Sequence, residues 1–387
     1  MEGMKLLRTL PKKKIKGKVC LLRLDLNVID EDPQEMHRLL ASLPTMRHLL
    51  ACGAKIVVVS HRGRPEKPDR ALSLKLFAPV LSKKLKTDVV FLPHALPTAK
   101  QWGMDFDHLR WNIATSPKRI FMLENIRFFP GEERNDAALA RSLASLADFY
   151  VNDAFAVCHR KNASVSAVAK FLPSYAGLLL EREIASLGKA MKKPKRPFVV
   201  IAGGAKVREK LDLMKIFWKS ADSFLLGGAV ANTCFAAEGE DVGNSVYDKT
   251  VLSEARKYAK AGKVYLPLDD LQYKRKILDI GPQTAEEYAR IIGHAKTILW
   301  SGPVGFYHEK RFASGTEKIW RAVISRAKDK NVFAVVGGGE TVASLELAGE
   351  TPDSLGKKRK NIFISTGGGA MVEFLAGKKL SGIEALE

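Results

Sequence analysis

Two glycine triplets near the end of the chain each follow a short apolar run. Residues 337–339 follow the run 333–336, and residues 367–369 follow the run 362–366. A glycine loop after a strand lets a ligand approach the backbone closely and leaves amide N–H groups pointing outward. A helix that begins there adds positive potential at the same place. Two such loops predict a phosphate-binding site, and therefore an enzyme.

Cationic side chains follow apolar runs in the first half of the chain. The candidates are Arg38, His61, Arg64, Arg127 and Arg160. Arginine binds carboxylate and phosphate in a bidentate manner, so several cations at strand ends suit a small, multiply charged anion. A lone arginine of this kind would more often belong to a surface ion pair. The grouping of several therefore favours a site.

The second half offers two lysines instead. Lys206 and Lys210 follow Gly203 and Gly204 and are spaced i, i+4, which predicts that they share one face of a helix. Together with glycine loops, two lysines suit a polyphosphate. Either lysine alone would not indicate a phosphate-binding site.

The elements that must position these residues are short β-branched runs separated by helical patterns, such as residues 317–327. Strands that alternate with helices predict parallel sheets covered on both faces. Ligands of such sheets bind at the carboxyl ends of the strands. All five glycine loops of the second half are predicted to lie there, at 203–204, 227–228, 301–303, 337–339 and 367–369. We expect an α/β fold with two Rossmann-like domains, each a parallel sheet with helices on both faces, joined by a hinge helix.

Length and composition indicate the class of protein. The 387 residues are enough for two or three domains, and the hydrophobic share of 46% is ordinary for a globular protein. No apolar run is long enough to cross a membrane, and residues 1–5 lack the apolar core of a signal peptide. The four cysteines do not pair as C-x-x-C, which favours reduced thiols. These features predict a cytoplasmic protein with no membrane partner.

The net charge of +21 is large. Strongly basic chains bind nucleic acid, anionic membranes or acidic metabolites. The lysine clusters lie far apart in the sequence, at 12–14, 192–196, 273–276 and 357–360. None is interleaved with aromatic residues, and no zinc-finger or RRM signature is present. Solvated basic faces are the simpler interpretation, so we expect no specific nucleic-acid partner; weak non-specific binding stays open.

An ordered series of motifs runs through nearly the whole chain, from about residue 19 to residue 386. The motifs are R-L-D-L-N-V at 23–28, S-H-R-G-R-P at 60–65, L-E-N-I-R-F at 123–128, P-G-E-E at 130–133, N-D-A-F at 152–155, G-G-A-K-V at 203–207, D-I-G-P at 279–282 and S-T-G-G-G-A at 365–370. In order and separation this series resembles phosphoglycerate kinase. A single GxGxxG would be weak, whereas this many ordered motifs are highly specific. The Walker A pattern and the protein-kinase motifs are missing.

The resemblance implies a phosphotransferase with a carboxyl group as acceptor. It would move a phosphoryl group between 1,3-bisphosphoglycerate and ADP, giving 3-phosphoglycerate and Mg-ATP. The implied phosphoglycerate ligands are Asp25, Asn27, Arg38, His61, Arg64, Arg127 and Arg160. The residues implied to act on the transferring group are Arg38, Lys206, Gly339 and Gly368. The implied nucleotide ligands are Gly203, Gly204, Lys210, Gly227, Gly228, Pro303, His308, Gly337, Gly338, Gly339, Glu340 and Thr341. Glu340 is also the implied ligand of Mg2+.

The resemblance also implies how the chain is divided. An N-terminal phosphoglycerate-binding domain would span residues 1–180, an interdomain helix 181–192 and a C-terminal nucleotide-binding domain 193–370. Residues 371–387 would return to the N-terminal domain. Domain closure over both substrates would exclude water that otherwise hydrolyses the acyl phosphate. The expected protein is a glycolytic, cytoplasmic monomer whose chemistry relies on positioning and charge neutralisation.

The chain departs from the family pattern mainly on the nucleotide side. Glu340 replaces a magnesium-binding aspartate, and Ser301 replaces the asparagine of W-N-G-P. His308 stands where a glutamate would hold the ribose, although the adjacent Glu309 could take that role.

These departures leave several interpretations open. One is an active kinase with altered nucleotide use, and another is a chain that keeps the fold and the anion site but has lost efficient transfer. The intact set of cations favours activity. A basic anion- or nucleic-acid-binding protein on the same scaffold is a further alternative. A Rossmann dehydrogenase is disfavoured because its fingerprint and downstream acidic residue are missing.

Overall fold

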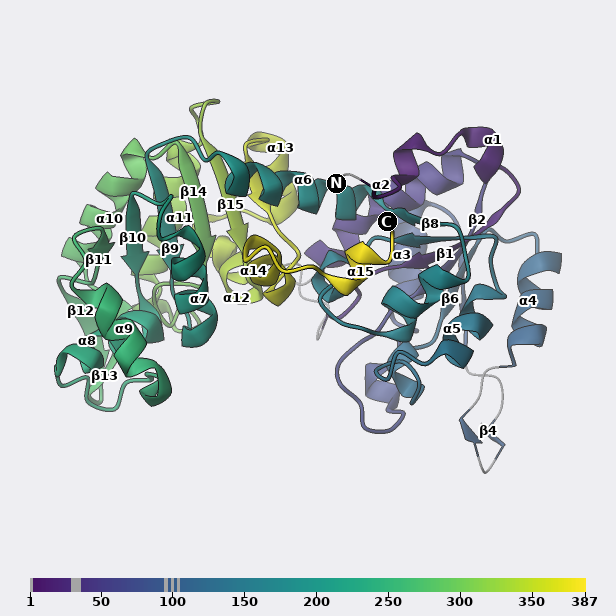
Figure 1. The fold of residues 1–387 in the computed structure, drawn as a ribbon, viewed down its shortest axis with the longest axis horizontal. Coiled ribbons are helices and arrows are strands. Elements are labelled where there is room, and N and C mark those ends of the chain that lie inside the picture. Colours follow the sequence, from purple (N-terminus) through teal and green to yellow (C-terminus); the bar gives the residue numbers. More distant parts are fainter. Residues whose placement is uncertain (1–2, 29–35, 94–96, 99–100, 103–104) are drawn as a thin grey trace. The chain divides into compact units, whose positions relative to one another are not determined.

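The structure is a computed structural model that describes residues 3–28, 36–93, 97–98, 101–102 and 105–387 (Figure 1). The chain divides into two compact units. The first unit comprises Met1–Ile184 and Lys379–Glu387, and the second comprises Ala185–Lys378. The sequence placed its divisions at residues 180, 192 and 370, and the functional roles given to those segments remain predictions.

The first unit is built on a six-stranded parallel sheet with the strand order β3-β6-β2-β1-β7-β8. Its strands are β1 (Val19–Arg23), β2 (Lys55–Val59), β3 (Val89–Leu92), β6 (Ile120–Leu123), β7 (Phe149–Asn152) and β8 (Ser174–Ala176). β-Branched and aromatic residues dominate these runs, which is the composition that a buried parallel sheet requires. The parallel sheet of short strands that the sequence predicted is thereby confirmed for this unit.

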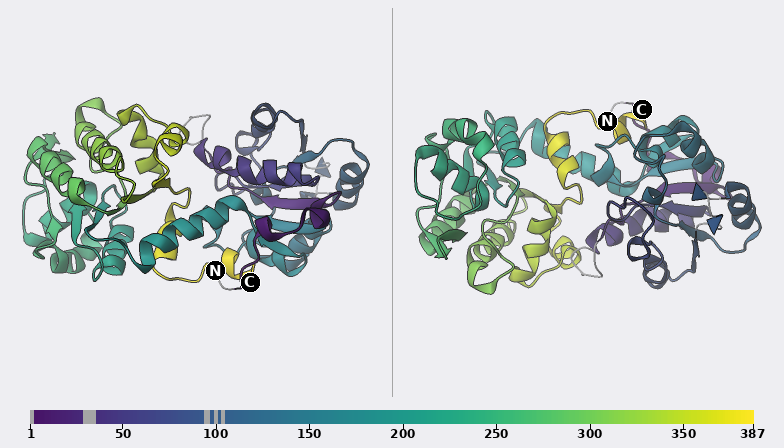
Figure 2. Two further views of the ribbon diagram at one scale, coloured as in Figure 1. Left: turned by 90° about the horizontal axis from the view of Figure 1, so that it is seen from above. Right: turned by 90° about the horizontal axis from the view of Figure 1, so that it is seen from below.

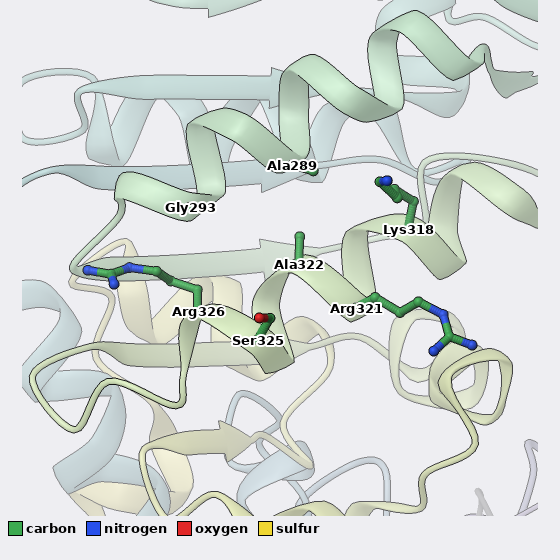
Figure 3. Close-up of a pocket in the computed structure, with 7 residues that line it drawn as sticks. All are labelled: Ala289, Gly293, Lys318, Arg321, Ala322, Ser325 and Arg326. Atoms are coloured by element: carbon green, nitrogen blue, oxygen red, sulfur yellow. The ribbon is translucent and has the colours of Figure 1, made fainter.

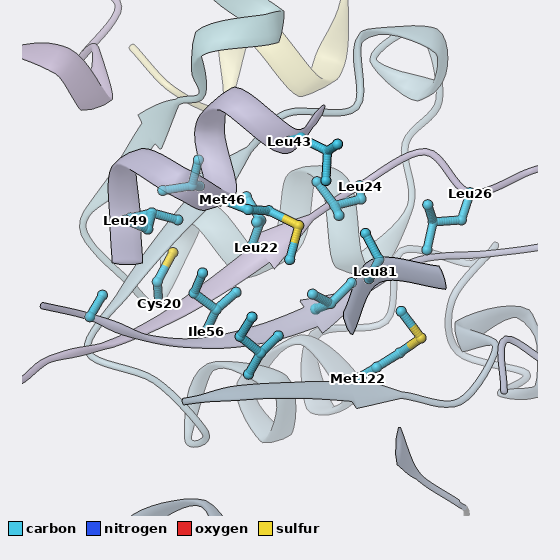
Figure 4. Packing of buried hydrophobic residues seen from close by; sticks show 14 of the residues in the cluster. Cys20, Leu22, Leu24, Leu26, Leu43, Met46, Leu49, Ile56, Leu81 and Met122 are labelled. Carbon is cyan, nitrogen blue, oxygen red and sulfur yellow. The ribbon is translucent and has the colours of Figure 1, made fainter. Parts of the chain in front are cut away.

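Both faces of this sheet are covered by helices and connections. On one face, Cys20 and Leu22 of β1 belong to the same buried cluster as Met46 and Leu49 of α2 (Figure 4). On the other, the Tyr150 hydroxyl donates a hydrogen bond to the carbonyl oxygen of Ser164 at 2.9 Å. The helices of this unit are α1 (Lys12–Ile15), α2 (His37–Ala51), α3 (Phe77–Leu85), α4 (Phe106–Thr115), α5 (Ala137–Ala144) and α15 (Ser381–Glu384), with a two-stranded hairpin of β4 (Pro97–Thr98) and β5 (Gln101–Trp102).

The C-terminal segment packs into the first unit. The amide of Gly382 donates to the carbonyl oxygen of Cys158 at 2.8 Å, and the side-chain amide of Asn152 donates to the Gly382 carbonyl at 3.2 Å. Near the other terminus, the amide of Lys5 donates to the Leu386 carbonyl at 3.3 Å. The two ends of the chain therefore lie side by side. Helix α6 (Leu178–Lys192) runs across the boundary between the units.

The second unit repeats the architecture with the strand order β11-β10-β9-β14-β15-β16, again parallel. The strands are β9 (Phe198–Ala202), β10 (Ser223–Leu226), β11 (Val264–Tyr265), β14 (Thr297–Ser301), β15 (Phe333–Gly337) and β16 (Ile362–Ile364), with a separate hairpin of β12 (Asp270–Tyr273) and β13 (Lys276–Ile280). The helices are α7 (Val207–Phe217), α8 (Gly228–Glu238), α9 (Leu252–Ala259), α10 (Pro282–His294), α11 (Ser314–Arg326), α12 (Gly339–Ala343), α13 (Pro352–Lys358) and α14 (Gly369–Leu375).

Alternate side chains of β9 show that this sheet is covered on both faces. Val199 and Ile201 belong to the same buried cluster as Tyr288 of α10. Phe198 points the other way, and its ring lies 5.3 Å from that of Phe217 in α7. Figures 1 and 2 show helices on both faces of each sheet, which confirms the expected α/β fold. Throughout the described residues, every helix is too short or too polar to cross a bilayer.

Candidate active site

The carboxyl end of β1 carries the first group of site residues. Asp25 accepts a hydrogen bond from Nη1 of Arg38 at 3.1 Å and another from the amide of Asn27 at 3.1 Å. The same Nη1 donates to the Asn27 carbonyl at 3.2 Å. The Arg38 side chain is still 27% exposed, so a ligand can reach its guanidinium. The carboxylate thus fixes the direction of the arginine.

His61 follows β2 and is held by Arg23, the last residue of β1. Nη2 of Arg23 lies 3.2 Å from Nδ1 of His61. A guanidinium can only donate, so Nδ1 accepts and the ring proton sits on Nε2. Burial, followed by the charges of Arg23, Arg127, Arg160 and Arg38, holds the pKa of His61 well below its usual value. The imidazole is therefore neutral at pH 7 and offers Nε2–H as a donor.

A buried chain of hydrogen bonds positions Arg23. Its Nε donates to Oγ of Ser164 at 2.9 Å, and that hydroxyl donates to Oε1 of Glu132 at 2.7 Å. Another guanidinium nitrogen, Nη1, donates to the Leu24 carbonyl. The sequence analysis gave Arg23 no role. An arginine at the end of an apolar strand could have indicated that this residue belongs to the site at the strand ends. We regard it as a positioning residue for His61.

Arg127 keeps part of its guanidinium without a partner. The side chain is 2% exposed, and Nη1 donates to the Gly63 carbonyl. Nε lies 3.5 Å from Oε1 of Glu133, yet neither Nε nor Nη2 has a hydrogen-bond partner among the described residues. A buried donor without a partner costs about 1–3 kcal/mol, and more when it is charged. Burial and the charge of Arg160 lower the pKa of Arg127 to about 10, so it is charged at pH 7 and suited to an incoming anion.

The remaining cations belong to the same group. Burial, followed by the charge of Arg64, lowers the pKa of Arg160, and the charge of Asp25 also acts on it. Arg64 itself is exposed. The structure thus brings together all seven residues that the resemblance assigned to phosphoglycerate. Their roles as ligands remain predictions.

In the second unit, three glycine-containing loops pack backbone against backbone. A Cβ added to Gly203 would lie 2.1 Å from the carbonyl oxygen of Pro303, and one added to Gly302 would lie 2.0 Å from that of Gly203. The backbone amides of these glycines donate hydrogen bonds to carbonyl oxygens within the protein. The acceptors are Ser301 for Gly203, Pro303 for Gly204, Ala202 for Gly227 and Val304 for Gly228. These glycines allow the three loops to pack closely, because a side chain at position 203 or 302 would collide with the neighbouring backbone.

The two triplets behave differently, because part of each is open. A Cβ at Gly339 or Gly368 would meet no described atom within 4 Å, whereas one at Gly337 would lie 2.4 Å from the sulfur of Met371. Helices begin at Gly339 and Gly369, as the sequence predicted. The backbone at Gly339 and Gly368 is therefore accessible to a ligand.

Thr341 lies within the short helix that follows the first triplet. It is fully buried, and its Oγ1 accepts the amide of Gly302 at 2.7 Å. Its side chain therefore holds the loop after β14 against α12.

Lys206 and Lys210 do not share a helix face, which corrects the sequence prediction. Helix α7 begins at Val207, so Lys206 is its N-cap residue, with a non-helical ψ of 74°, and only Lys210 lies within the helix. The Lys206 side chain is 74% exposed and lies 3.6 Å from Glu209. Lys210 is only 6% exposed, and burial lowers its pKa to about 8. The two lysines differ in environment although both follow the same glycine loop.

Glu340 is the acidic residue at the open triplet. Its Oε2 accepts a hydrogen bond from the Tyr307 hydroxyl at 3.0 Å and lies 3.0 Å from Nε2 of His308. Its side chain is 67% exposed. Neither contact was anticipated, since only the fold brings residues 307–308 beside it. Sequence reasoning gave Tyr307 no role, and an aromatic in a loop carried no signal for one.

The described residues hold no group of three or more His, Cys, Asp or Glu side chains that could bind a metal alone. Mg2+ commonly binds through one or two carboxylates and completes its shell with water and substrate phosphates. An exposed carboxylate beside open glycine backbone fits that mode, so Glu340 can hold Mg2+ together with a nucleotide.

A groove of about 490 Å³ lies elsewhere in this unit, between α10 and α11 (Figure 3). Its cations are all paired: Lys318 with Glu286 at 2.7 Å, Arg321 with Glu317 at 2.7 Å and Arg326 with Asp329 at 3.4 Å. This groove therefore leaves none of its described cations free to receive an anion.

Comparisons with known proteins agree with this geometry. The family model for phosphoglycerate kinase matches residues 10–378. A phosphoglycerate kinase from Desulfosudis oleivorans is 39% identical over 413 residues, covering 99% of each chain. One from Thermus thermophilus is 39% identical over 407 residues and covers 98% of this chain and 100% of its own length. The solved structure of phosphoglycerate kinase from Pyrococcus horikoshii OT3 matches with a TM-score of 0.81 and 30% identity, over 99% of this chain and 98% of that one.

Proposed function

The chain belongs to the phosphoglycerate kinase family, and from that premise we propose how its own residues carry out the reaction. The reaction is glycolytic: 1,3-bisphosphoglycerate and Mg-ADP exchange a phosphoryl group reversibly to give 3-phosphoglycerate and Mg-ATP. In the reverse direction the acceptor is a carboxyl group. Neither a loss of nucleotide use nor a nucleic-acid-binding role finds support in the comparisons.

Phosphoglycerate binds at the strand ends of the first unit. The observation that carries this proposal is the buried guanidinium of Arg127, which has two nitrogens with no hydrogen-bond partner among the described residues. A phosphate or carboxylate supplies the missing acceptors in a bidentate manner. The neutral His61 adds a directed donor, and Asp25 and Asn27 hold Arg38 beside it.

The nucleotide binds at the strand ends of the second unit. Gly203, Gly204, Gly227 and Gly228 supply the backbone surface for the base, and the open backbone at Gly339 approaches the phosphates. Lys210 neutralises charge on the phosphates and Lys206 on the transferring group. Glu340 holds Mg2+, which when bound neutralises phosphate charge.

Transfer requires two substrates that bind to different units to meet. We therefore infer that the units close during turnover, which removes water from the reacting acyl phosphate. Small-angle X-ray scattering should show a smaller radius of gyration with 3-phosphoglycerate and Mg-ATP together than with either alone. The same radius in all three samples would contradict closure. The family membership also supports a cytoplasmic monomer.

The experiment that tests the function is a coupled assay of ATP formation from 1,3-bisphosphoglycerate and ADP. We expect Mg-dependent turnover, and its absence with every nucleoside diphosphate would refute the proposal. Arg38→Ala should lower kcat by roughly a hundredfold to a thousandfold and weaken phosphoglycerate binding far less. Arg47→Ala is the matched control, because Arg47 is an exposed arginine on the same helix. Equal losses in kcat and in binding for Arg38→Ala would argue against a transition-state role.

A further inference from the structure

A second cationic site lies in the second unit, at the end of the sheet opposite to the glycine loops. A groove of about 580 Å³ opens at the amino ends of β9, β14, β15 and β16. It is lined by the connections that lead from α6, α11 and α13 into the strands, together with Thr297. The glycine loops of the nucleotide site follow the carboxyl ends of the same strands, so the two sites are separated by the length of the sheet.

The lining of this groove is strongly positive. Nine lysine and arginine side chains contribute to it: Lys189, Lys193, Lys195, Lys328, Lys330, Lys357, Lys358, Arg359 and Lys360. The carboxylates beside them are Glu350, paired with Lys358 at 2.7 Å, Asp353, paired with Lys357 at 2.7 Å, and Asp329, paired with Arg326 at 3.4 Å. Three carboxylates cannot balance nine cations. Lys193 and Lys195 from the cluster at 192–196 meet the cluster at 357–360 here, whereas the sequence suggested only scattered basic faces.

Several of these cations lack partners. Arg359 donates from Nη1 to the Lys358 carbonyl at 3.0 Å, but its buried Nε has no hydrogen-bond partner among the described residues. No described carboxylate forms an ion pair with Lys193, Lys328 or Lys330. The groove in Figure 3 differs, because each of its cations has a carboxylate.

A structural explanation covers only part of this set. Basic residues in the last turn of a helix interact favourably with its dipole, and Lys357 and Lys358 end α13. Lys330 lies farther beyond the end of α11, and the structure shows no carboxylate paired with it among the described residues. Like charges in one groove repel one another, so a fold that gathers them is stabilised when an anion binds.

We propose that this groove binds a polyphosphorylated anion, a molecule that carries several phosphate groups close together. Its volume lies within the usual range for small-molecule sites, about 300–1,000 Å³. Lysine binds phosphate as a point charge, so a lysine-rich lining suits dense phosphate charge more than a single carboxylate. The only aromatic residue in the lining, Phe333, is covered by Nζ of Lys189 at 4.5 Å from the ring centre. Without an exposed aromatic ring for base stacking, single-stranded nucleic acid fits less well.

The test measures binding while the substrates occupy the active site. Isothermal titration calorimetry with tripolyphosphate is run on the whole protein in saturating 3-phosphoglycerate and Mg-ADP. The groove variant carries Lys328→Gln, Lys330→Gln and Lys360→Gln. The matched control carries Lys12→Gln, Lys13→Gln and Lys14→Gln, which removes the same charge from exposed positions of the first unit.

We expect the groove variant to bind tripolyphosphate roughly tenfold to a hundredfold more weakly, since each exposed pair contributes a factor of about two to five. The control variant should change affinity by less than about threefold. Both should keep the kinase activity of the unmodified protein, which shows that they fold and separates this test from that of the proposed function.

A second arm distinguishes the source of the phosphates. Phosphatidylcholine vesicles with and without phosphatidylinositol 4,5-bisphosphate are compared for binding in a flotation assay. Binding that needs the phosphoinositide and is lost in the groove variant supports the proposal with a lipid headgroup as the source. Binding of tripolyphosphate alone supports it with a free anion. Equal weakening of both variants, no binding of either probe, or tighter binding of a single-stranded oligonucleotide than of tripolyphosphate would overturn it.

Discussion

Replacing Lys210 with methionine should stabilise the folded protein while it removes activity. Lys210 lies within α7 and is only 6% exposed. Burial is the main cause that lowers its pKa to about 8, with the charge of Glu209 opposing the shift and that of Lys206 adding to it. The ammonium group is still mostly protonated at pH 7. The protein without nucleotide therefore carries a buried positive charge that Glu209 neutralises only in part.

The pKa shift sets the size of the effect. The pKa of Lys210 falls from 10.5 in the unfolded chain to about 8 in the folded protein. Since one pKa unit corresponds to about 1.36 kcal/mol, the buried charge lowers the free energy of unfolding by about 3 kcal/mol below pH 8. Between about pH 8 and pH 10.5 the unfolded chain holds the proton that the folded protein has lost, so the free energy of unfolding rises with pH. Methionine fills a similar volume and has a similar helix propensity. We expect a gain of about 2–3 kcal/mol at pH 7 that disappears above about pH 10.5.

The assay is urea unfolding followed by tryptophan fluorescence, at pH 7 and near pH 10. Trp218, Trp300 and Trp320 all lie in the second unit and report on it. Lys215→Met is the matched control, because Lys215 is exposed on the same helix. The control should change the free energy of unfolding by less than about 0.5 kcal/mol. In the coupled assay, Lys210→Met should lower kcat/KM for ADP by roughly a hundredfold.

Two results would refute this reasoning. If Lys210→Met is no more stable than the control at pH 7, burial of the charge does not destabilise the fold. If it is more stable by the same amount at both pH values, the gain comes from packing rather than from the charge.

Three further predictions concern the same sites. His61 should show the 15N shifts of a neutral Nε2–H imidazole down to pH values well below 6.5, because burial and Arg23 oppose its protonation; a titration near its ordinary pKa would contradict the assigned tautomer. Glu340→Asp should keep the fold and change the Mg2+ concentration required for half-maximal activity, since the carboxylate withdraws from its Tyr307 and His308 contacts; an unchanged Mg2+ dependence would remove Glu340 from the metal site. Gly339→Ala should fold normally yet lose activity, whereas Gly302→Ala should lower the melting temperature, because only the Cβ at position 302 would collide with backbone, at 2.0 Å. Equal melting temperatures for the two variants would contradict this difference.

Local sequence patterns account for the strands and the loops that follow them. The run 333–336 is apolar and β-branched, and the glycines after it favour a break, so both strand β15 and the start of α12 follow from neighbouring residues alone. The same holds for the strand 55–59 and the cations after it. Parallel sheets then bring the strand ends to one edge, which is why the sequence could group His61 with Arg127.

Contacts between distant residues could not be predicted in this way. Arg23 and His61 are separated by 38 residues, and His308 and Glu340 by 32, so each pair depends on register and loop conformation that no local pattern encodes. The environment of the lysines was missed for a smaller reason. Lys206 precedes helix α7 and is exposed, whereas Lys210 lies within the helix and is buried, and neither environment is encoded by the spacing of the two lysines.

The second anion site follows from the same physical criterion as the first. Arg127 at the phosphoglycerate site and Arg359 in the lysine-rich groove both have buried guanidinium nitrogens with no hydrogen-bond partner among the described residues. The cations between α10 and α11 are fully paired, and that groove carries no sign of a ligand. A buried guanidinium nitrogen without a hydrogen-bond partner destabilises the free protein, and a bound anion removes that penalty. The melting temperatures of the groove variant and of the unmodified protein test this idea. If the variant melts at a higher temperature without tripolyphosphate and at the same temperature with it, the cations destabilise the free protein and the anion removes that effect. If the groove variant melts at a lower temperature under both conditions, these lysines stabilise the fold and do not serve anion binding.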